Sequence, residues 1–421
     1  TLRDLGAKLF FGHSESHLRS MDVVVVSSAI SEDNPEYMYA KQERLPIMRR
    51  AEMLNYIMST FTKQIGVTGT HGKTSTSSMI VRVLEAAGMA PTYMVGSDFN
   101  DYGGNASYQP GLYAVAEVDE SDGSFLDVHS STSIITNIEP EHLNFYKTEA
   151  RMVDYYRQYM EMVVSSGGYL VLNRDDVTLT DLSKQFPSDK IVFFSLEEPS
   201  DVQAKHIEFL KDGIRYELFL KGVSHGLVEL RVFGAHNVYN SLSIIAMSIQ
   251  EGFGLDMVKK GLLNFTGTQR RLQLIGERKS ILIYDDYGHH PTEIKVTLDA
   301  LKKSLDRRVV CIFQPHRYSR TRDFMTLFSK AFDAADLVVI TEVYSAFESK
   351  ISGVSGKMIA DRLCEQSPGK ALFISHKGEV AHQLFSQLKE GDVVVTMGAG
   401  DVYTVAKELY TRLKDPIVSE G

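Results

Sequence analysis

The sequence predicts an α/β fold divided among three domains. The chain has 421 residues, and at about 100 to 200 residues per domain this length allows two to four domains. Short runs of β-branched residues recur along the chain and indicate buried parallel strands. Amphipathic stretches of helical length lie between many of these runs, and this alternation is typical of α/β layers joined by right-handed crossovers.

The first domain is expected to be short and to cover residues 1–58. Its clearest β-branched run lies at 23–26 and predicts a strand. The chain begins at Thr1 in a segment that resembles the middle of an α/β unit. We therefore expect the natural N-terminus to be absent from this sequence.

The second domain is expected to span residues 59–267, beginning near Ser59 and ending near Gly267, where a helical pattern breaks. Residues 208–232 alternate apolar and polar side chains around glycine-containing turns, which predicts antiparallel hairpins added to this domain. The other strands and helices of this domain are expected at 65–67, 113–118, 134–138, 77–87 and 241–252.

The third domain is expected to span residues 268–421. Polar residues or proline stand at the start of its helical stretches, as is usual where helices begin. Its strands are expected at 281–284, 309–313, 337–341, 371–374 and 393–396, and its helices at 291–305, 322–335 and 380–389.

The composition limits the kinds of partner. Lys and Arg number 45 against 54 Asp and Glu, a net charge of −9, which argues against broad binding to nucleic acid or anionic membranes. Any phosphate site must therefore be local. No run approaches the ~18 consecutive apolar residues of a membrane helix, and Cys311 and Cys364 form no disulfide or zinc pattern. We expect a cytoplasmic protein with no nucleic-acid or membrane partner.

The strongest local motif is the string GTHGKTST at residues 69–76, which follows an expected strand and precedes an expected helix. This order is what a phosphate cradle requires. Gly72 would let backbone N–H groups approach nucleotide phosphates, Lys73 would supply positive charge, and Thr74 could place its hydroxyl on Mg²⁺. Val67 stands where the usual pattern has its first glycine, so a helix-capping turn in an unrelated α/β domain is the alternative.

Two acidic strings end expected strands of the second domain, AEVDESD at 116–122 and TNIEPEH at 136–142. Ligands of open α/β sheets collect at the carboxyl ends of strands. Carboxylates of the first string could reach Mg²⁺, which prefers oxygen ligands, and His142 is a candidate metal ligand. A solvated acidic loop and a structural histidine are the alternatives.

The string HNVYN at 236–240 opens an expected helix. Asn237 and Asn240 are three residues apart, so both amides can share one helix face and reach an adenine edge. An ordinary capped helix start is the alternative. Arg270 and Arg271 lie at the junction with the third domain, where one of them could reach the γ-phosphate when the domains close.

Two polar strings follow strands of the third domain, DDYGHHP at 285–291 and QPHRYSRTR at 314–322. The three arginines of the second string offer forked recognition of a carboxylate or phosphate, and a solvated basic turn is the alternative. A zinc site formed by His289 and His290 is disfavoured because adjacent histidines seldom converge on one ion.

Taken together, these strings resemble the Mur ligase family of peptidoglycan synthesis along nearly the whole chain. The resemblance rests on SSAI, GTHGKTST, EVDESDGSF, TNIEPEHLNFY, HNVYN, RRLQLIGE, DDYGHHPTE, FQPHRYSRTRD and MGAGDV. It implies a truncated Rossmann-like first domain, a P-loop ATPase-like central domain with an added antiparallel sheet, and a Rossmann-like last domain. It also implies an enzyme that uses ATP and Mg²⁺ to join an amino acid to a UDP-sugar carboxylate through an acyl phosphate. The strings are most similar to the branch that adds L-alanine to UDP-N-acetylmuramate.

The resemblance implies roles for individual residues, in four overlapping groups. The catalytic residues would be Lys73, Glu117, His142, His289 and Arg320. The metal ligands would be Thr74, Glu117 and His142. The ATP contacts would be Gly69, Thr70, His71, Gly72, Lys73, Thr74, Ser75, Asn237, Asn240, Arg270 and Asp285. The substrate contacts would be His13, Ser28, Asn137, Tyr287, His289, Arg317 and Arg320.

Three departures from the family pattern stand out. The opening strand and glycine-rich turn that help to bind the UDP pyrophosphate would precede Thr1, Val118 replaces a usual alanine, and the YSAFE string at 344–348 lacks the usual Pro and Gly. Other functions remain open. A recycling ligase would attach a preformed peptide to the same UDP-sugar, although TNIEPEHLNFY and DDYGHHPTE favour alanine addition. A nucleotide-gated binding protein and a simple kinase are alternatives of other classes.

Overall fold

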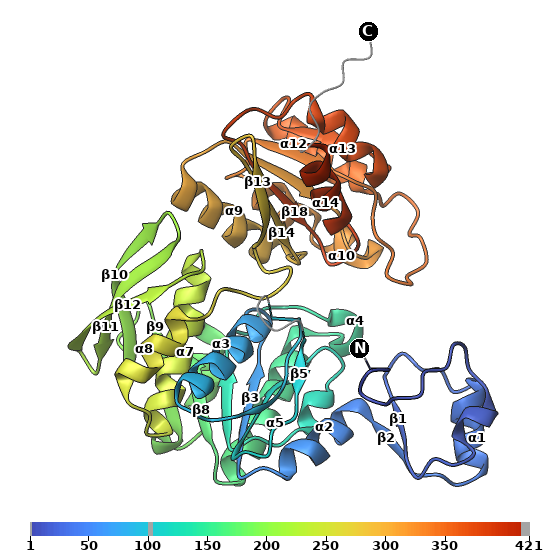
Figure 1. The fold of residues 1–421 in the computed structure, drawn as a ribbon, viewed down its shortest axis with the longest axis vertical. Helices are drawn as coiled ribbons and strands as arrows, with labels where there is room; N and C mark the ends of the chain where they lie inside the picture. The colour runs from blue at the N-terminus through green and yellow to red at the C-terminus, as the bar shows by residue number, and fades with distance from the viewer. Residues whose placement is uncertain (1, 100–103, 414–421) are drawn as a thin grey trace.

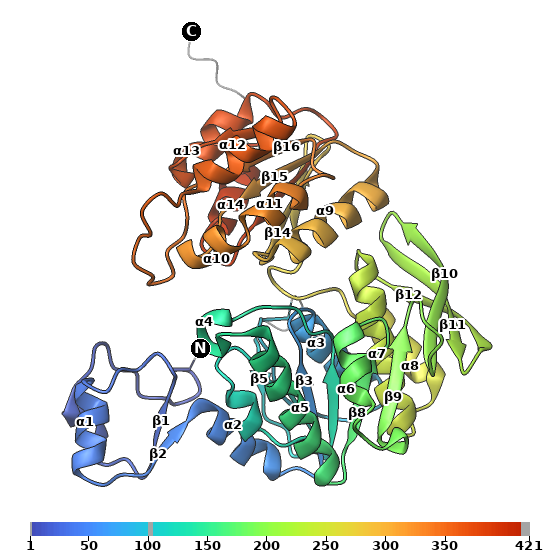
Figure 2. The same ribbon diagram turned by 180° about the vertical axis from the view of Figure 1, so that it is seen from behind.

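A computed structural model shows the fold, and it describes residues 2–99 and 104–413 (Figure 1). The described residues form three sheets, of two, ten and six strands. Figures 1 and 2 show the small sheet to one side of the ten-stranded sheet, and the six-stranded sheet with its helices above the latter. The predicted α/β class with three parts is confirmed.

The first part is a thin unit around two parallel strands, β1 (Val24–Val26) and β2 (Ile47–Arg49). The helix α1 (Pro35–Gln42) begins with Asn34 as its cap, followed by proline, a usual helix start. The predicted strand at 23–26 is present, but only Val24 of β1 is buried and Val25 is 45% exposed. The expectation of a fully buried strand is therefore wrong here. The helix α2 (Arg50–Ser59) leads into the central sheet.

The central sheet has the strand order β12-β11-β10-β9-β8-β7-β3-β6-β4-β5. Its strands are β3 (Lys63–Thr68), β4 (Thr92–Met94), β5 (Ala106–Ser107), β6 (Tyr113–Glu117), β7 (Thr132–Ile135), β8 (Tyr169–Asn173), β9 (Ile191–Ser195), β10 (Val202–Leu210), β11 (Gly213–Leu220) and β12 (Val223–Leu230). The predicted hairpins are β10 to β12, and they continue the same sheet because β10 pairs in parallel with β9.

Helices cover both faces of the central sheet and enclose two apolar cores. The helices α3 (Lys73–Ala86), α7 (Ala235–Gln250) and α8 (Leu255–Leu263) contribute to one core. The short helix α4 (Leu143–Tyr146), with α5 (Glu149–Ser165) and α6 (Val177–Ser183), contributes to the other. Because β3 pairs in parallel with both β6 and β7, the carboxyl ends of these three strands meet at one edge of the sheet.

The last sheet has the order β13-β14-β18-β15-β16-β17 and is parallel except for β13. Its strands are β13 (Gln273–Arg278), β14 (Ile281–Asp286), β15 (Val309–Phe313), β16 (Leu337–Ile340), β17 (Ala371–Phe373) and β18 (Val393–Met397). Its helices are α9 (Pro291–Leu305), α10 (Tyr318–Asp323), α11 (Met325–Ala331), α12 (Gly356–Gln366), α13 (Lys377–Phe385) and α14 (Tyr403–Arg412).

Several predicted bounds are wrong, for local reasons. The helix expected at 322–335 is two helices, α10 and α11, separated at Phe324. The buried Phe332 and Ala335 prolong the apolar pattern beyond the end of α11. The helices expected at 77–87 and 241–252 begin earlier, at Lys73 and Ala235. Their first turns carry buried polar residues, so the apolar pattern that predicts a helix starts only after them.

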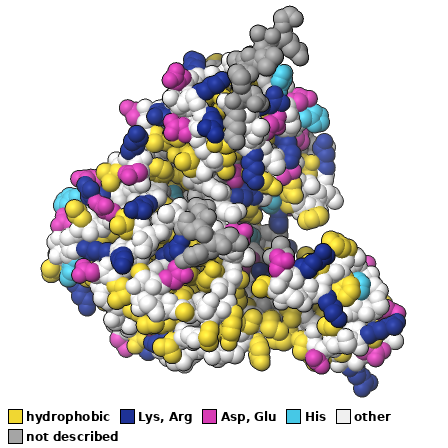
Figure 3. Space-filling model, in the orientation of Figure 1, with side chains coloured by type: hydrophobic (Ala, Val, Ile, Leu, Met, Phe, Trp, Pro, Cys, Tyr) yellow, Lys and Arg dark blue, Asp and Glu magenta, His cyan; other side chains and the backbone are white. Residues whose placement is uncertain are grey.

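Two further features bear on function. None of the helices within residues 2–99 and 104–413 is long and apolar enough to cross a membrane. On the face in Figure 3, Lys and Arg side chains lie among Asp and Glu side chains, and the surface is hollowed between the first and last parts. Charge of one sign does not dominate this face.

Candidate active site

The string GTHGKTST lies between β3 and the body of α3: residues 69–72 form the loop and residues 73–76 form the first turn of α3. Gly69 and Gly72 have φ angles of +125° and +87°, which favour glycine. A Cβ on Gly69 would lie 2.2 Å from Thr136 Oγ1, and a Cβ on Gly72 would lie 2.7 Å from Asn240 Oδ1. The loop is thus packed between the end of β7 and the start of α7, and only glycine fits at these two positions.

Asn137 supports this loop. The backbone N–H of His71 donates to Asn137 Oδ1 at 2.9 Å, and Asn137 Nδ2 donates to the carbonyl of His71 at 3.1 Å. The Thr136 hydroxyl donates to the same carbonyl at 2.6 Å. Asn137 is predicted as a substrate contact, and in the structure it holds the loop in shape.

Lys73 is the first residue of α3, and its ammonium group points back across the loop. Nζ lies 2.5 Å from the carbonyl oxygen of Gly69, 3.2 Å from that of Thr70 and 2.9 Å from Glu120 Oε1. Burial by itself lowers the pKa of Lys73, but the nearby carboxylates of Glu120 and Glu117 outweigh it and raise the pKa. Lys73 is therefore charged.

Two of the predicted metal ligands, Thr74 and Glu117, lie side by side. Glu117 Oε2 accepts hydrogen bonds at 2.8 Å from Thr74 Oγ1 and from the backbone N–H of Gly96. A Cβ on Gly96 would lie 2.4 Å from Glu117 Oε2, so the glycine makes room for the carboxylate. A hydroxyl and a carboxylate are hard oxygen donors, so this pair fits Mg²⁺.

His142, the third predicted metal ligand, caps α4 with a φ of +54°. Its Nε2 lies 3.8 Å from Glu120 Oε1 and 3.7 Å from Glu141 Oε2. Burial lowers the pKa of His142. The ring is therefore neutral, the form that can bind a metal ion.

Glu141 connects the central part to the last part of the chain. Arg320 Nη2 donates to Glu141 Oε1 at 2.8 Å, and His289 Nε2 lies 3.8 Å from the same oxygen. Burial opposes ionisation of Glu141, but His142, His289 and Arg320 hold its pKa near 2. Burial also lowers the pKa of His289 to about 4. Glu141 is thus an anion beside the predicted substrate residues of the last part.

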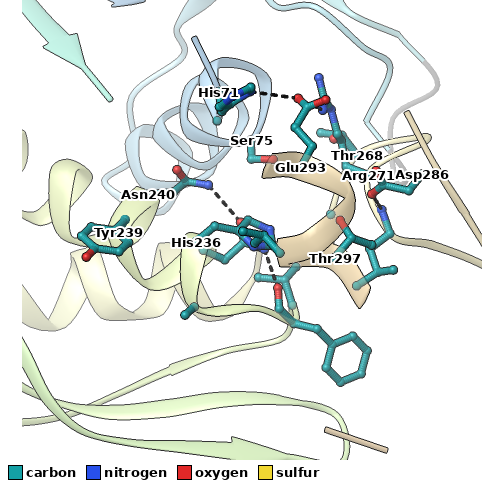
Figure 4. A pocket seen from close by; sticks show the side chains of 18 of the residues that line it. His71, Ser75, His236, Tyr239, Asn240, Thr268, Arg271, Asp286, Glu293 and Thr297 are labelled. Carbon is teal, nitrogen blue, oxygen red and sulfur yellow. Dashed lines mark hydrogen bonds and ion pairs between the residues drawn. The ribbon is translucent and has the colours of Figure 1, made fainter. Parts of the chain in front are cut away.

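His71 makes a second connection between the two parts. Its Nδ1 lies 3.2 Å from Glu293 Oε1 at the start of α9 (Figure 4). Its Nε2 lies 3.5 Å from Glu139 Oε2. Burial by itself lowers the pKa of His71, but the two carboxylates raise it to about 10. Thr292 Oγ1 also donates to Glu139 Oε2 at 2.8 Å. A charged imidazolium therefore bridges the phosphate loop and α9.

Two cavities lie along this junction. The larger, of about 870 Å³, is lined by residues that include His71, Gly72, Ser75, Asn137, Asn237 and Asn240. The smaller, of about 660 Å³, is lined by residues that include Thr70, Lys73, Glu117, His142, Tyr287, His289, Arg317 and Arg320. Arg271 and Glu293 line both cavities, and Arg271 Nη1 lies 3.7 Å from Glu293 Oε1. The predicted adenine contacts thus lie at the larger cavity and the predicted substrate residues of the last part at the smaller one, while predicted ATP contacts line both.

Arg270 and Asp285 line neither cavity. Arg270 Nε donates to Asp285 Oδ2 at 3.1 Å, and Nη2 donates to the carbonyl of Gly398 at 2.6 Å. Their neighbours face the cavities instead, since Arg271 lines both cavities and Asp286 the larger one. Identical residues stand side by side at both positions, so the string alone cannot say which of them faces the site.

His236 is a residue that the sequence reasoning missed. It lines the larger cavity, and its Nε2 lies 3.1 Å from Asn237 Nδ2. Asn240 Nδ2 donates in turn to Asn237 Oδ1 at 3.0 Å, so these side chains form a row at the start of α7. Burial lowers the pKa of His236 to about 4. The sequence offered one signal for this residue, since His236 stands in the string HNVYN directly before the predicted adenine contacts.

The first part reaches the smaller cavity through β1 and α2, but not through its two predicted substrate contacts. His13 binds Glu36 at 2.7 Å and is half exposed, Ser28 is exposed, and neither lines a cavity. Val25 and Arg50 instead reach the smaller cavity, and Arg50 Nη2 lies 3.7 Å from Asp119 Oδ2. The contacts between the first and central parts thus include Arg50 of α2 with Asp119, and Ser28 with Asp122.

Known proteins match this chain along its length. The descriptions that match are "Mur ligase family, catalytic domain" over residues 1–62, "Mur ligase middle domain" over 67–248, and "Mur ligase, glutamate ligase domain" over 270–400. The UDP-N-acetylmuramate–L-alanine ligase of Desulforamulus reducens is 38% identical over 98% of this chain and 89% of that protein.

Solved structures agree with these matches. The UDP-N-acetylmuramate-alanine ligase of Thermotoga maritima superposes with a TM-score of 0.83 at 28% identity, covering 98% of this chain and 90% of that one. A murein peptide ligase from Psychrobacter arcticus shares the fold, with a TM-score of 0.67 at 24% identity over 99% and 91% of the two chains. Because the matches run through all three parts that meet at the two cavities, the chain belongs to the Mur ligase family.

Proposed function

We propose that this chain is an ATP-dependent ligase that joins L-alanine to the carboxylate of UDP-N-acetylmuramate, forming ADP and phosphate, in the synthesis of peptidoglycan precursors. The observation that carries the proposal is the smaller cavity, which brings Lys73, Glu117 and His142 opposite His289, Arg317 and Arg320. The full-length relatives named for this reaction support the choice of substrates.

The first step activates the acid. A carboxylate is a poor electrophile, and transfer of the γ-phosphoryl group of ATP to one of its oxygens creates a good leaving group. The transferred group is negatively charged and requires positioned positive charge. Lys73 supplies it from the central part, and Arg271, which lies between the two cavities, can supply it from the junction.

The second step forms the amide bond. The amine of L-alanine attacks the acyl phosphate, and phosphate leaves with the bonding electrons. Water competes with the amine, so closure of the last part over the central part protects the intermediate. His289 is neutral and buried in the cavity, where it can accept a proton from the amine. Arg317 and Arg320 hold the carboxylates of the two substrates.

Thr74, Glu117 and His142 would hold Mg²⁺. Their hydroxyl, carboxylate and neutral imidazole suit a divalent ion. When bound, the ion supplies positive charge to the phosphates and to the anionic intermediate. ATP would lie along the phosphate loop, with its adenine in the larger cavity beside Asn237 and Asn240. Domain limits of 1–58, 59–267 and 268–421 and a cytoplasmic location complete the proposal.

The test is phosphate release from ATP and Mg²⁺ in the presence of UDP-N-acetylmuramate, with L-alanine, with a preformed tripeptide, or with neither. Release that depends on L-alanine supports the proposal. Release that depends on the tripeptide alone identifies a recycling ligase. Transfer of phosphate without any amine identifies a kinase, and binding of nucleotide without transfer identifies a nucleotide-gated protein.

A further inference from the structure

The ammonium group of Lys73 is fully occupied within the protein. A lysine ammonium has three N–H donors. Its three partners here are the carbonyl oxygens of Gly69 and Thr70 and the Oε1 atom of Glu120, at 2.5, 3.2 and 2.9 Å. A nucleotide phosphate can therefore bind Lys73 only after one of these partners gives way.

Glu120 is the only ionisable side chain among these three partners; burial raises its pKa to about 7, and the ammonium of Lys73 opposes this rise. Its side chain is 3% exposed, so it is as deeply buried as an apolar core residue. Its backbone is fixed, because its carbonyl accepts hydrogen bonds from the Tyr146 hydroxyl and from the backbone N–H of Gly123. The second carboxylate oxygen, Oε2, is buried and has no hydrogen-bond partner among the described residues. Leaving one oxygen of a buried carboxylate unpaired costs folding free energy, so this arrangement calls for an explanation.

The neighbouring carboxylates are engaged elsewhere. Glu117 Oε2 accepts from Thr74 and from Gly96. Asp119 faces Arg50, 3.7 Å away, and is 43% exposed. Glu120 is thus the carboxylate of this string that pairs with Lys73.

We propose that Glu120 is a positioning residue that holds Lys73 across the phosphate loop and gives it up to the phosphates when nucleotide binds. This inference rests on the proposed function, since it requires a nucleotide at the loop. Glu120 supplies a buried acceptor and counter-charge for the ammonium, a role that the phosphates take over when nucleotide binds. It also competes with the phosphates for the same donor, so it weakens nucleotide binding and favours release of ADP.

The experiment measures ADP binding by calorimetry to the wild-type chain and to the nearly isosteric variant Glu120→Gln. The variant should bind ADP about tenfold more tightly, in line with the loss of one competing charged hydrogen bond. Its KM for ATP should fall in parallel. The matched control is Asp119→Asn, which removes a carboxylate charge from the same loop without removing a hydrogen bond of Lys73, and its ADP affinity should change less than twofold.

A double-mutant cycle with Lys73→Ala separates this role from general repulsion between Glu120 and the phosphates. In the Lys73→Ala background, Glu120→Gln should no longer tighten ADP binding. Unchanged or weaker binding by Glu120→Gln overturns the inference, as does equal tightening by Asp119→Asn or tightening that persists without Lys73.

A substitute variant and two further outcomes complete the experiment. If Glu120→Gln fails to unfold cooperatively, Glu120→Asp replaces it, since the shorter side chain withdraws the carboxylate from Lys73 and should change affinity in the same direction. Wild-type binding of ADP with no difference in the variants rejects this inference alone. Absence of ADP binding by the wild-type chain rejects the proposed function together with it.

Discussion

Gly69 combines a left-handed backbone with the closest steric limit in the phosphate loop. Gly69→Ala should destabilise the protein by about 1 to 3 kcal/mol through backbone strain, and it should weaken nucleotide binding because the new methyl group displaces Thr136. Thermal unfolding and ADP titration measure the two effects. Gly88→Ala is the control, since Gly88 also has a positive φ but no atom within 4 Å of its Cβ position. Unchanged ADP affinity in Gly69→Ala would show that the loop has room for a side chain.

Lys73 acts on charge that develops during phosphoryl transfer. Lys73→Ala should lower turnover by at least about 10² to 10³-fold, the usual effect of removing one stabilising donor, while the protein stays folded. Turnover is measured as phosphate release and folding as thermal unfolding. Lys63→Ala is the control, because Lys63 lies on β3 and pairs with Glu251 away from the loop. Near-normal turnover of Lys73→Ala would remove the loop from the mechanism.

The sequence predicts residues of this kind when they lie in one contiguous string. Lys73 and Thr74 follow a strand and a glycine turn, so their place in space follows from their place in the chain. The choice between Arg270 and Arg271 could not be made in this way. Neighbouring side chains point in different directions, and which one faces the cavity depends on the ion pair that Arg270 makes with Asp285.

At the scale of elements, the hairpins β10 to β12 support the helix that carries the predicted adenine contacts. Tyr216 on β11 is fully buried, and its hydroxyl lies 2.8 Å from Ser241 Oγ on α7. Tyr216→Ala should cost about 3 to 5 kcal/mol of unfolding free energy and weaken nucleotide binding by shifting α7. Denaturant unfolding and ADP titration measure these effects. Tyr56→Ala, at a position 62% exposed, should cost less than about 0.5 kcal/mol. Full ADP affinity in Tyr216→Ala would show that α7 does not need the hairpins.

Elements were predicted best where pattern and boundary signals agree. The helix at 291–305 and the strand at 309–313 match α9 and β15. Proline stands at the first position of α9, and Glu293 accepts a hydrogen bond from the backbone N–H of His290. Residues next to one another in the sequence therefore determine where α9 begins. The break between α10 and α11 has no such signal in the sequence.

At the scale of the whole molecule, the contact between the central and last parts includes charged pairs that close over the site. His71 joins Glu139 of the central part to Glu293 of the last part, and the two carboxylates raise its pKa to about 10, against about 6.5 for an unfolded histidine. The raised pKa of His71 stabilises the folded state. This contribution is complete below about pH 6.5 and is lost as the pH rises toward 10, by up to about 1.4 kcal/mol of unfolding free energy per pH unit.

The stability difference between the wild-type chain and His71→Gln should therefore be largest near pH 6 and shrink toward pH 10. Unfolding free energies across this range measure it. The exposed His225 on β12 provides the control substitution, His225→Gln. A difference that does not change with pH would contradict a charged bridge at His71.

The sequence could not predict these long-range pairs. Arg320 and Glu141 are 179 positions apart, and His71 and Glu293 are 222 positions apart. Each residue had an ordinary alternative when taken alone, such as a solvated turn or a structural histidine. Their pairing depends on how two separately folded sheets meet, and no local pattern encodes that.

The shared wall of the two cavities has a consequence for inhibitor design. Arg271 and Glu293 line both spaces and form an ion pair between them. A compound with a purine-like group for the larger cavity and an acidic group for the smaller one could fill both at once, provided that its linker is slim and carries polar atoms where it passes this pair. Linking the two groups raises their effective concentration at the second site. Such a molecule would also fasten the last part of the chain onto the central part and so stop the enzyme between turnovers.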